Sequence, residues 1–464
     1  MEIYKFSWHW LLMNFFIPFE IKNRDYLSRL LVAYYAAEKG YDVCLGSKSQ
    51  IDTLVKTSKA GIYLGLVTTK TYSKFYKKLK ENNFKIFVID EEGLITFDDK
   101  MYIDLKVSED ALINIENLFT WGEEHKKIIL TKFPKFKKKV ISTGTPRFDL
   151  FQSKYRNIFE INVSKIIKKY NDFTLICGSF SFVNHFTKDL NYLNVLKSQK
   201  VIKNIDDENK FLKYCKYNKE SFENFIELTI KLSKKFKDHK FIYRPHPAEN
   251  AQIYKEKFVN LKNVFIEKDF TLIEWIIASR CLIHSYCTSS IEALLVDKTR
   301  FALKENFDPE VHKTIPYEFS DTSKSIDEMI EKYTLFLNNS LNYKYTKNNC
   351  KLRLNKYVSN DDNYISSEKI IDQIFSLYPP QQDKSNKKFD FFIFNLLYYF
   401  RLIKRYFYNF KDNYKKHNKY IDHKIGNISL SEINYHLTFF KKKNSLLNVK
   451  KIKKNLFLLK KNKI

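Results

Sequence analysis

Short apolar runs alternate with segments of helical periodicity along the first third of the chain. The runs typical of buried strands are residues 10–18, 41–46, 61–66, 85–90, 117–121 and 140–143. Between them, apolar positions recur every three to four residues over 24–39, 72–82 and 123–132, which predicts amphipathic helices. Strand–helix–strand alternation at this spacing builds parallel sheets covered on both faces. Residues 1–155 are therefore expected to form a Rossmann-like α/β domain.

A second alternation of the same kind begins after a polar, basic stretch at residues 152–172. Its strand-like runs are 173–179, 240–244, 264–266, 281–285 and 300–303, and its helical segments are 219–236, 271–279, 289–296 and 325–336. Residues 156–378 are therefore expected to form a second Rossmann-like domain. Two prolines at 379 and 380, followed by a polar run, predict a linker. We expect the remainder of 379–464 to be a basic, aromatic and helical tail.

The positive charge of the chain is concentrated in this tail. The 464 residues carry 81 Lys and Arg against 53 Asp and Glu, a net charge of +28, and residues 384–464 hold 21 basic and 4 acidic side chains, or +17. Apolar residues make up 44% of the chain, which excludes disorder for most of it. The charge and the many aromatics also suit a non-enzymatic nucleic-acid-binding protein, a lesser alternative. Because no recognised motif of that class is present, no nucleic-acid partner is expected.

The cysteines and the apolar segments indicate the cellular compartment in which the protein is expected. The six cysteines form no Cys-x-x-Cys and no cluster with zinc spacing, so reduced core thiols are expected, with no metal and no cofactor. Residues 8–19 are apolar but contain His9 and Asn14, which predicts a buried first strand and not a signal peptide. The longest other apolar stretch, 391–400, is far shorter than the roughly 20 residues that span a bilayer. We therefore expect a cytoplasmic protein.

The first candidate site follows the strand at 85–90. Ligands of open parallel sheets bind outside the carboxyl ends of the strands, so the residues just after each strand deserve inspection. Here the chain reads Asp90-Glu91-Glu92-Gly93. Carboxylates crowded together favour a raised pKa, which suits a general base for a sugar hydroxyl. The alternative is a solvated acidic turn. Glu20 and Arg24, which follow the first strand, are expected at the same edge.

The second candidate site follows three strands of the second domain. Arg244-Pro245-His246-Pro247 ends one strand, and a cation with an imidazole there suits a phosphate or nucleotide. The run from Ser285 to Glu292 brings hydroxyls to the start of a helix, where anions bind. A plain capping box, Ser289-x-x-Glu292, is the structural alternative. After another strand come Ser179, Asn184 and His185.

The positions of the glycines limit the class of ligand that the second domain is expected to bind. Eight of the nine glycines lie at or before position 178, so most of the second domain has no glycine-rich phosphate loop. Neither Gly-x-Gly-x-x-Gly nor a Walker A sequence occurs. The pattern argues against NAD or ATP as the main ligand and predicts that side chains and a helix end hold the phosphate.

Together these segments resemble bacterial surface-carbohydrate biosynthesis proteins of the lipopolysaccharide and capsule type. They are similar to glycosyltransferases of the GT-B fold, especially the Kdo-transferring and capsule-building groups. The resemblance spans about residues 10–375 and rests on ordered motifs at 19–25, 39–48, 90–94, 121–123, 143–149, 244–247 and 288–293.

The resemblance implies a metal-independent transferase with two Rossmann-like domains facing a cleft. The second domain would bind a nucleotide-sugar donor, with a CMP-linked ulosonic acid such as Kdo as one option, and the first a glycan or lipid-linked glycan acceptor. Its implied catalytic residues are Glu91, Glu92 and His246. The implied donor-binding residues are Ser179, Arg244, Ser285, Thr288, Ser289, Ser290 and Glu292, and the implied acceptor-binding residues are Glu20, Arg24, Asn184 and His185. A nucleotide-sugar epimerase or a polyol-phosphate transferase of related fold is the alternative.

The tail lies outside the resemblance. Residues 389–410 hold eleven aromatics, with Arg401, Lys404 and Arg405 at helical spacing. A basic, aromatic helix too short to span predicts peripheral contact with an anionic inner membrane, where lipid-linked acceptors lie. The competing interpretation is a final core helix packed on the catalytic unit.

Overall fold

The computed structural model describes residues 15–93, 99–186, 192–305, 307–308, 315–360, 363–380, 391–408, 410, 418, 421–422, 424–441 and 447–462. The beginning of the predicted first strand (10–14) and most of the predicted linker (381–390) lie outside these residues. The chain divides into two compact units. Unit 1 comprises residues 1–91, 106–158 and 356–464, and unit 2 comprises 92–105 and 159–355.

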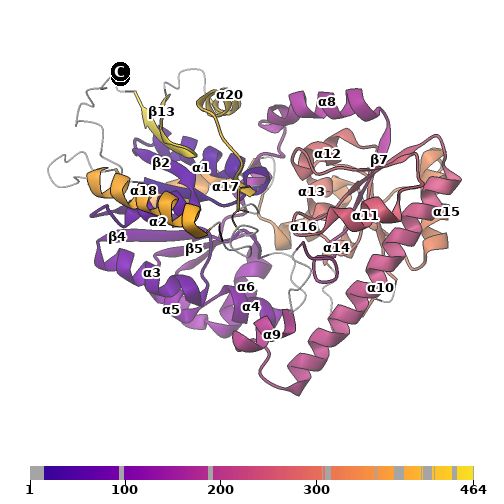
Figure 1. The fold of residues 1–464 in the computed structure, drawn as a ribbon, viewed down its shortest axis with the longest axis horizontal. Helices are drawn as coiled ribbons and strands as arrows, with labels where there is room; N and C mark the ends of the chain where they lie inside the picture. Colours follow the sequence, from indigo (N-terminus) through magenta and orange to yellow (C-terminus); the bar gives the residue numbers. More distant parts are fainter. Residues whose placement is uncertain are drawn as a thin grey trace. The chain divides into compact units, whose positions relative to one another are not determined.

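Unit 1, which includes the labelled strands β2, β4, β5 and β13 in Figure 1, is built on an eight-stranded sheet of order β13-β14-β2-β1-β3-β4-β5-β6. Its strands are β1 (Phe15–Phe19), β2 (Val43–Ser47), β3 (Gly61–Gly65), β4 (Phe84–Ile89), β5 (Asn117–Thr120), β6 (Val140–Ser142), β13 (Leu447–Lys453) and β14 (Leu456–Lys461). Strands β1 to β6 pair in parallel, and β14 pairs antiparallel with β2 and β13. All five residues of β1 are buried, as expected of a central strand covered on both faces.

The helices of unit 1 follow the predicted alternation and add several elements. They are the π-helix η2 (Lys22–Tyr26), α1 (Leu27–Glu38), α2 (Lys48–Val55), α3 (Lys70–Glu81), α5 (Glu109–Asn114), α6 (Glu123–Lys132), η3 (Pro134–Phe136), α7 (Pro146–Asp149), α17 (Ser366–Leu377), α18 (Phe391–Tyr408) and α20 (Leu430–Phe440). The short 3-10 helix η4 (Arg156–Phe159) leads out of this unit.

Unit 2 is built on a six-stranded, all-parallel sheet of order β12-β11-β10-β7-β8-β9. Its strands are β7 (Phe173–Cys177), β8 (Lys240–Arg244), β9 (Val264–Ile266), β10 (Cys281–His284), β11 (Arg300–Leu303) and β12 (Asp321–Ser323). Its helices are α4 (Asp99–Lys106), α8 (Glu160–Tyr170), α9 (Tyr192–Ser198), α10 (Ile205–Lys235), α11 (Ala251–Lys257), α12 (Leu272–Ala278), α13 (Ser289–Leu295), α14 (Ile315–Glu318), α15 (Ile326–Leu337) and α16 (Lys347–Tyr357). A core of apolar side chains from β7, β8, β10 and β11 packs against α10 and α15.

The two parallel-sheet α/β units required by the predicted fold class are both present, so the fold class is confirmed. Each predicted strand in the described ranges is a strand, with ends shifted by two residues at most. Several helices were not predicted, and one begins earlier than predicted. The polar stretch at 152–172 contains α8, and α10 begins at Ile205, well before 219. The start of α10 carries a clear signal, because the Asn204 side chain accepts a hydrogen bond from the Asp207 backbone N–H.

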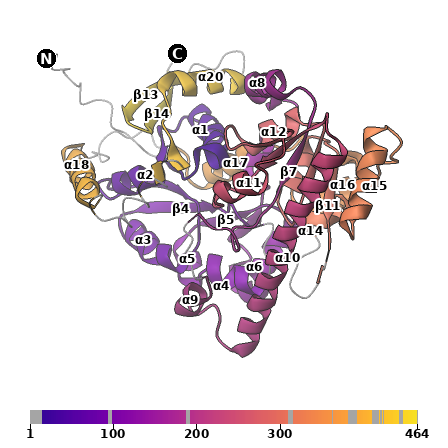
Figure 2. The same ribbon diagram turned by 45° about the vertical axis from the view of Figure 1, so that its right-hand side comes forward.

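The predicted domain boundaries require correction at two places. Residues 92–105, expected in the first domain, belong to unit 2. Residues 356–378, expected in the second domain, belong to unit 1, where α17 packs on α1. The tail is likewise part of unit 1 and is only partly helical, since β13 and β14 extend the sheet (Figure 2). The physical reason is that β2 would otherwise present an unpaired edge, and β14 covers it.

A buried polar network holds α17 in place. The Asp149 carboxylate accepts hydrogen bonds from the backbone N–H groups of Ser366 (2.9 Å) and Ser367 (2.7 Å), and from the Asn360 amide (2.7 Å). The Asn360 side chain also accepts the Thr145 N–H at 2.8 Å. The motif at 143–149 therefore anchors the returning segment, because its carboxylate satisfies the first N–H groups of the helix.

Glycine is required at the neighbouring Trp-Gly motif. A Cβ atom at Gly122 would collide with the backbone carbonyl of Tyr357. The Ser359 N–H donates to the Trp121 carbonyl at 2.8 Å, so the returning chain lies directly against this turn. The motif thus has a packing role within unit 1.

The three cysteines expected within apolar strands, Cys44, Cys177 and Cys281, are buried, whereas Cys215 and Cys287 are only partly buried. All six cysteines are free thiols, and Cys350 is buried as well. Burial raises the pKa of Cys281 to about 12, which keeps this thiol protonated.

Candidate functional site

Each sheet has one point where the direction of strand addition reverses. In unit 1, β1 lies between β2 and β3, and in unit 2, β7 lies between β10 and β8. Successive crossover connections leave these strands on opposite sides, which opens a crevice at the carboxyl ends where α/β proteins bind ligands. The residues that follow β1 and β7 and the strands near them, out to β4 in unit 1 and to β8 and β10 in unit 2, are therefore the candidates.

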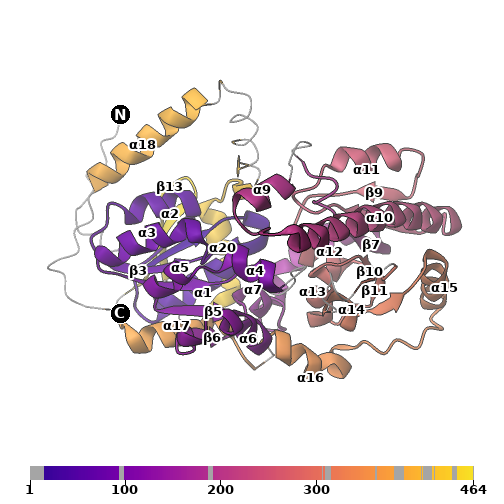
Figure 3. The same ribbon diagram turned by 90° about the horizontal axis from the view of Figure 1, so that it is seen from below.

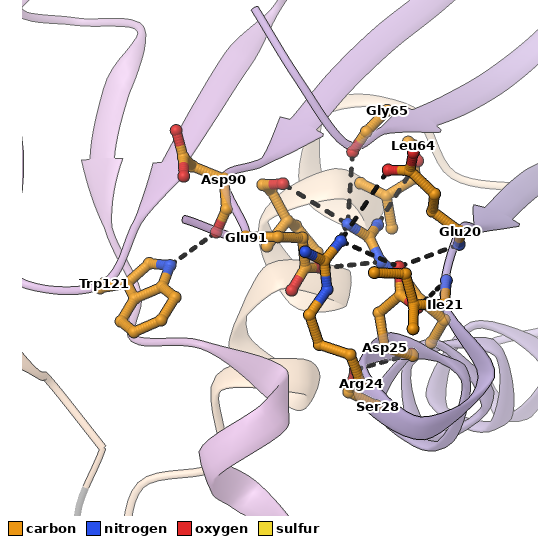
Figure 4. Close-up of polar contacts among 12 residues, drawn as sticks. Glu20, Ile21, Arg24, Asp25, Ser28, Leu64, Gly65, Asp90, Glu91 and Trp121 are labelled. Atoms are coloured by element: carbon orange, nitrogen blue, oxygen red, sulfur yellow. Dashed lines mark hydrogen bonds and ion pairs between the residues drawn. The ribbon is translucent and has the colours of Figure 1, made fainter. Parts of the chain in front are cut away.

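At the reversal point of unit 1, a buried aspartate shapes the turn after β1. The Asp25 carboxylate accepts the backbone N–H groups of Glu20 (2.9 Å) and Ile21 (2.7 Å) (Figure 4). Asp25 is fully buried, and this burial raises its pKa to about 6, with the negative charge of Glu91 acting in the same direction. The carboxylate fixes the π-helix η2 at the carboxyl end of β1.

A buried ion pair joins this turn to the neighbouring strands. The Arg29 guanidinium donates to Glu91 Oε1 from Nε at 3.0 Å and from Nη2 at 2.6 Å. It also faces the carbonyl oxygens of Leu64, Gly65 and Ile89 at 3.4–3.5 Å, at the ends of β3 and β4. The side chains of both partners are nearly inaccessible, at 1% and 6% exposed. The pair therefore ties α1 to two strand ends.

This geometry changes the interpretation of the acidic motif at residues 90–93. The sequence predicted Glu91 as a catalytic carboxylate, whereas the structure places its side chain in the ion pair with Arg29. A base role for Glu91 stays a prediction, and its contacts favour a positioning role. Glu92, the other predicted catalytic carboxylate, is exposed and counts with unit 2.

Asp90 has a different neighbour. Its buried carboxylate Oδ2 lies 4.0 Å from Nε2 of His125, and its backbone carbonyl accepts the Trp121 indole N–H at 2.6 Å (Figure 4). His125 Nδ1 accepts the Trp121 backbone N–H at 3.3 Å, which directs the Nε2 proton toward Asp90. The sequence reasoning missed His125, although its place in the first turn of α6, directly after a strand, was a usable signal.

Two predicted acceptor residues lie at this reversal point. Arg24 Nη2 is 3.8 Å from Glu20 Oε2 and 3.8 Å from Asp25 Oδ2. Both Arg24 and Glu20 are partly exposed. The structure thus brings Glu20 and Arg24 together just after β1, as predicted.

At the reversal point of unit 2, the buried Glu249 connects the residues that follow neighbouring strands. The sequence reasoning missed this residue. Glu249 accepts the Phe180 N–H at Oε1 (2.6 Å) and the Tyr254 hydroxyl at Oε2 (2.6 Å). Burial raises the pKa of Glu249 to about 7. Since Phe180 follows β7 and Glu249 follows β8, this carboxyl links two adjacent strand ends. Its position within Arg-Pro-His-Pro-Ala-Glu-Asn was the available signal.

The hydroxyl and amide residues predicted for this edge join the same network. The Ser179 N–H donates to Ser285 Oγ at 3.3 Å, which connects the ends of β7 and β10. The Asn184 side chain donates to the Asn250 carbonyl at 3.0 Å, and His185 forms a backbone bridge with Glu249. The carboxyl ends of the central strands of unit 2 thus bring together Ser179, Asn184, His185 and Ser285. The structure therefore assigns Asn184 and His185 to the unit predicted to bind the donor.

The Arg-Pro-His-Pro motif is held by the loop after β9. The Arg244 guanidinium donates to the carbonyls of Asp269 (3.0 Å) and Phe270 (2.8 Å). Burial lowers the pKa of Arg244, yet an arginine remains charged at neutral pH. His246 is exposed, and its Nδ1 accepts the Ala248 N–H at 3.2 Å. The motif therefore brings a fixed cation and an accessible imidazole to the carboxyl end of β8.

The serine-rich helix start differs from prediction in one detail. The N-cap of α13 is Thr288, and Ser289 is already the first helical residue, so the capping box expected at Ser289-x-x-Glu292 is absent. Ser289, Ser290 and Glu292 are buried, and the Ser290 hydroxyl donates to the Cys287 carbonyl at 3.1 Å. Among the described residues, no group of three or more His, Cys, Asp or Glu gathers as a metal site would need.

Comparison with known proteins gives likenesses of structure only. No protein-family model matches the chain, and no curated protein matches it. A solved structure of UDP-GlcNAc 2-epimerase from Methanocaldococcus jannaschii is similar at 15% identity, with a TM-score of 0.44, over 76% of this chain and 81% of that one. A structure of the wall teichoic acid polymerase TagF is similar at 13% identity, TM-score 0.47, over 78% and 87%. The UDP-GlcNAc 2-epimerase of Neisseria meningitidis is similar at 15% identity, TM-score 0.42, over 71% and 80%.

Proposed function

We propose that this chain is a glycosyltransferase that moves a sugar from a nucleotide-sugar donor to a growing cell-surface glycan. One observation carries the proposal: in each unit, the polar residues after the strands gather at the reversal point of a parallel sheet, where such sheets bind ligands. In unit 2 these residues are hydroxyls, an arginine and a histidine, a set that suits a sugar diphosphate. In unit 1 they are carboxylates and an arginine, a set that suits a polyhydroxyl acceptor.

The proposed chemistry is a displacement at the anomeric carbon. The acceptor oxygen forms a bond to that carbon, the bond from the carbon to the phosphate oxygen breaks, and the nucleotide leaves with the electron pair. Arg244 supplies positive charge near the leaving phosphate, and His246 donates a hydrogen bond or a proton to it. Groups held in place before the reaction stabilise the developing charge without reorganisation, which is where much of the rate arises.

A carboxylate of unit 1 takes the acceptor proton in this proposal. We place Asp90 first, because Glu91 is already bound by Arg29 whereas Asp90 faces the imidazole of His125. A neighbouring imidazole can orient a carboxylate and share the proton that it receives. Glu92 is the exposed alternative, and either carboxylate would act as nucleophile if the enzyme retains the anomeric configuration.

The test is product analysis with CMP-, UDP- and GDP-linked sugars, with and without lipid-linked glycan acceptors. Free nucleotide that appears only with an acceptor, together with a lengthened glycan, supports transfer. A changed sugar still attached to its nucleotide would assign the chain to epimerisation, and transfer of a polyol phosphate would assign it to the other related activity. A donor that binds the folded chain is also detectable without turnover, by a rise in its unfolding temperature.

The variant His246→Ala should lower turnover by about 10²–10³-fold if the imidazole acts on the leaving phosphate. Because His246 is exposed, the variant should keep its unfolding temperature. His239→Ala controls for the loss of a histidine away from the site, since His239 lies before β8, at the opposite end of the strand from His246. Because the His239 ring bonds Thr174 Oγ1 at 2.9 Å, activities are compared per folded protein. Near-normal turnover of a folded His246→Ala chain would remove this residue from the mechanism.

A further inference from the structure

The helix α18 has two faces of different character. One face is attached to unit 1: Phe394 is fully buried, Arg401 donates to the Ser49 carbonyl and to Thr53 on α2, and Arg405 pairs with Asp422 at 2.6 Å. Figure 3 shows α18 in orange along the outside of this unit, beside α2. The core-helix interpretation therefore holds for this face alone.

The opposite face is apolar and open. Its side chains recur at helical spacing over three turns and are each 53–65% exposed: Leu396, Tyr399, Phe400, Ile403, Tyr406 and Phe407. At 100° per residue these positions span about a third of the helix circumference, centred opposite Phe394 and Arg401. We call this set the outer stripe. A contiguous row of large apolar side chains on a surface marks an interaction site.

The charge around the outer stripe selects the partner. The helix contains no Asp or Glu and carries Arg401, Lys404 and Arg405. Lys453 of β13 lies with its ammonium 5.1 Å from the ring centre of Tyr399, at the border of the stripe. In sequence, the segment 384–464 to which α18 belongs has a net charge of +17. A second copy of the chain would bring the same positive charge and be repelled, whereas an anionic surface with an apolar interior matches both features.

We propose that α18 lies in the interface of an anionic lipid membrane, with the outer stripe in the acyl region and Lys404 and Lys453, which lie beside the stripe, at the headgroups. No helix in the described ranges is both long enough and apolar enough to cross a bilayer, and α18 itself carries three cations near its middle and end. Helices with an apolar face and basic flanks bind in the plane of the interface. This inference goes beyond the proposed enzymatic function and does not depend on it.

The test is flotation of the full-length chain with lipid vesicles, in the absence of any nucleotide. Removing the tail is unsuitable, because β14 completes the sheet of unit 1. Vesicles of phosphatidylcholine are compared with vesicles that also contain phosphatidylglycerol. We expect flotation only with the anionic vesicles, and its loss at high salt. Equal flotation with both vesicle types, or none with either, would overturn the proposal.

The double variant Phe400→Glu with Phe407→Glu probes the outer stripe. It should lower vesicle binding by about tenfold or more, because two charges would enter the acyl region. The matched control, Val259→Glu with Leu352→Glu, makes the same change in charge at exposed apolar positions of unit 2 and should bind as the wild type does. If both double variants lose binding equally, net charge alone explains it and the stripe has no role.

A second readout locates the helix directly. Tryptophan in Phe400→Trp should shift its emission to shorter wavelength on anionic vesicles and be quenched by brominated acyl chains, whereas Leu352→Trp should show neither change. Self-association that Phe400→Glu with Phe407→Glu abolishes, with vesicle binding unaffected, would assign the stripe to a second copy and refute the membrane proposal.

Discussion

Replacing Glu91 with Gln removes one charge of a buried ion pair and leaves the other in place. Arg29 would keep its guanidinium charge in a site that is 1% exposed. Its remaining acceptors, the carbonyls of Leu64, Gly65 and Ile89, lie at 3.4–3.5 Å, beyond the 2.7–3.2 Å or so of a good N–H···O bond. They therefore compensate little for the lost carboxylate.

The magnitude follows from the burial of both partners. Removing one member of a buried ion pair costs about 3–5 kcal/mol, because the other charge stays desolvated and uncompensated. For a unit of this size, each kcal/mol shifts the unfolding midpoint by roughly 2–4 °C, so Glu91→Gln should lower it by about 10 °C. Any fall in activity should then follow the loss of folded protein.

The assay is urea unfolding monitored by the fluorescence of the four tryptophans, of which Trp121 lies in unit 1, where its indole donates to the Asp90 carbonyl, and Trp275 lies in unit 2. Glu92→Gln is the matched control: the same change, one residue along the chain, at an exposed carboxylate that should lose less than about 0.5 kcal/mol. Equal stability of the two variants would refute the reasoning. So would a double variant, Arg29→Leu with Glu91→Leu, that is less stable than Glu91→Gln, since removing both charges should recover stability.

Two further predictions concern stability. The pKa of Glu249 is raised from its usual 4.5 to about 7, so the folded state favours its protonated form, and the stability this group contributes is present below about pH 4.5 and lost as the pH rises through 7. In Glu249→Gln, the fall in unfolding free energy between about pH 4.5 and 7 should be smaller by up to about 3 kcal/mol. If the unfolding free energy of the variant depends on pH as that of the wild type does, the raised pKa is contradicted. Gly122→Ala should cost more than about 2 kcal/mol in urea unfolding, because its Cβ would meet the Tyr357 carbonyl, while Glu123→Ala beside it should be nearly neutral.

The fold was predictable because its strands are central in parallel sheets. A strand buried on both faces is an unbroken apolar run, as in β1 and in residues 86–89 of β4, and such runs stand out against helical periodicity. The tail was not predictable by this route. Strand β13 alternates in exposure and is rich in lysine, because it is the outermost strand of the sheet, so its sequence resembles a solvated tail.

The position of the candidate site was also predictable, whereas its buried partners were not. Strand ends can be read from the sequence, which is why Glu20 and Ser285 were found. Arg29 sits within a helical pattern, and nothing local shows that it meets Glu91, 62 residues away. Glu249 and His125 were missed for the same reason: their significance comes from burial and from donors on other elements. The motif at 143–149 was noticed, but its anchoring role depends on Asn360 and Ser366, more than 200 residues away.

The pairing of β14 with β2 has a consequence for folding during synthesis on the ribosome. Leu456 pairs with Gly46, so strand β2 in the sheet of unit 1 can gain this partner only after about 410 further residues have been synthesised. At roughly 5–20 residues per second, that delay is about 20–80 s. Throughout this interval the nascent chain exposes an unpaired β2 edge while the whole of unit 2 is being synthesised. Elongation speed and chaperone access during that window therefore become determinants of yield, and slowing translation after residue 50 should increase aggregation of the nascent chain.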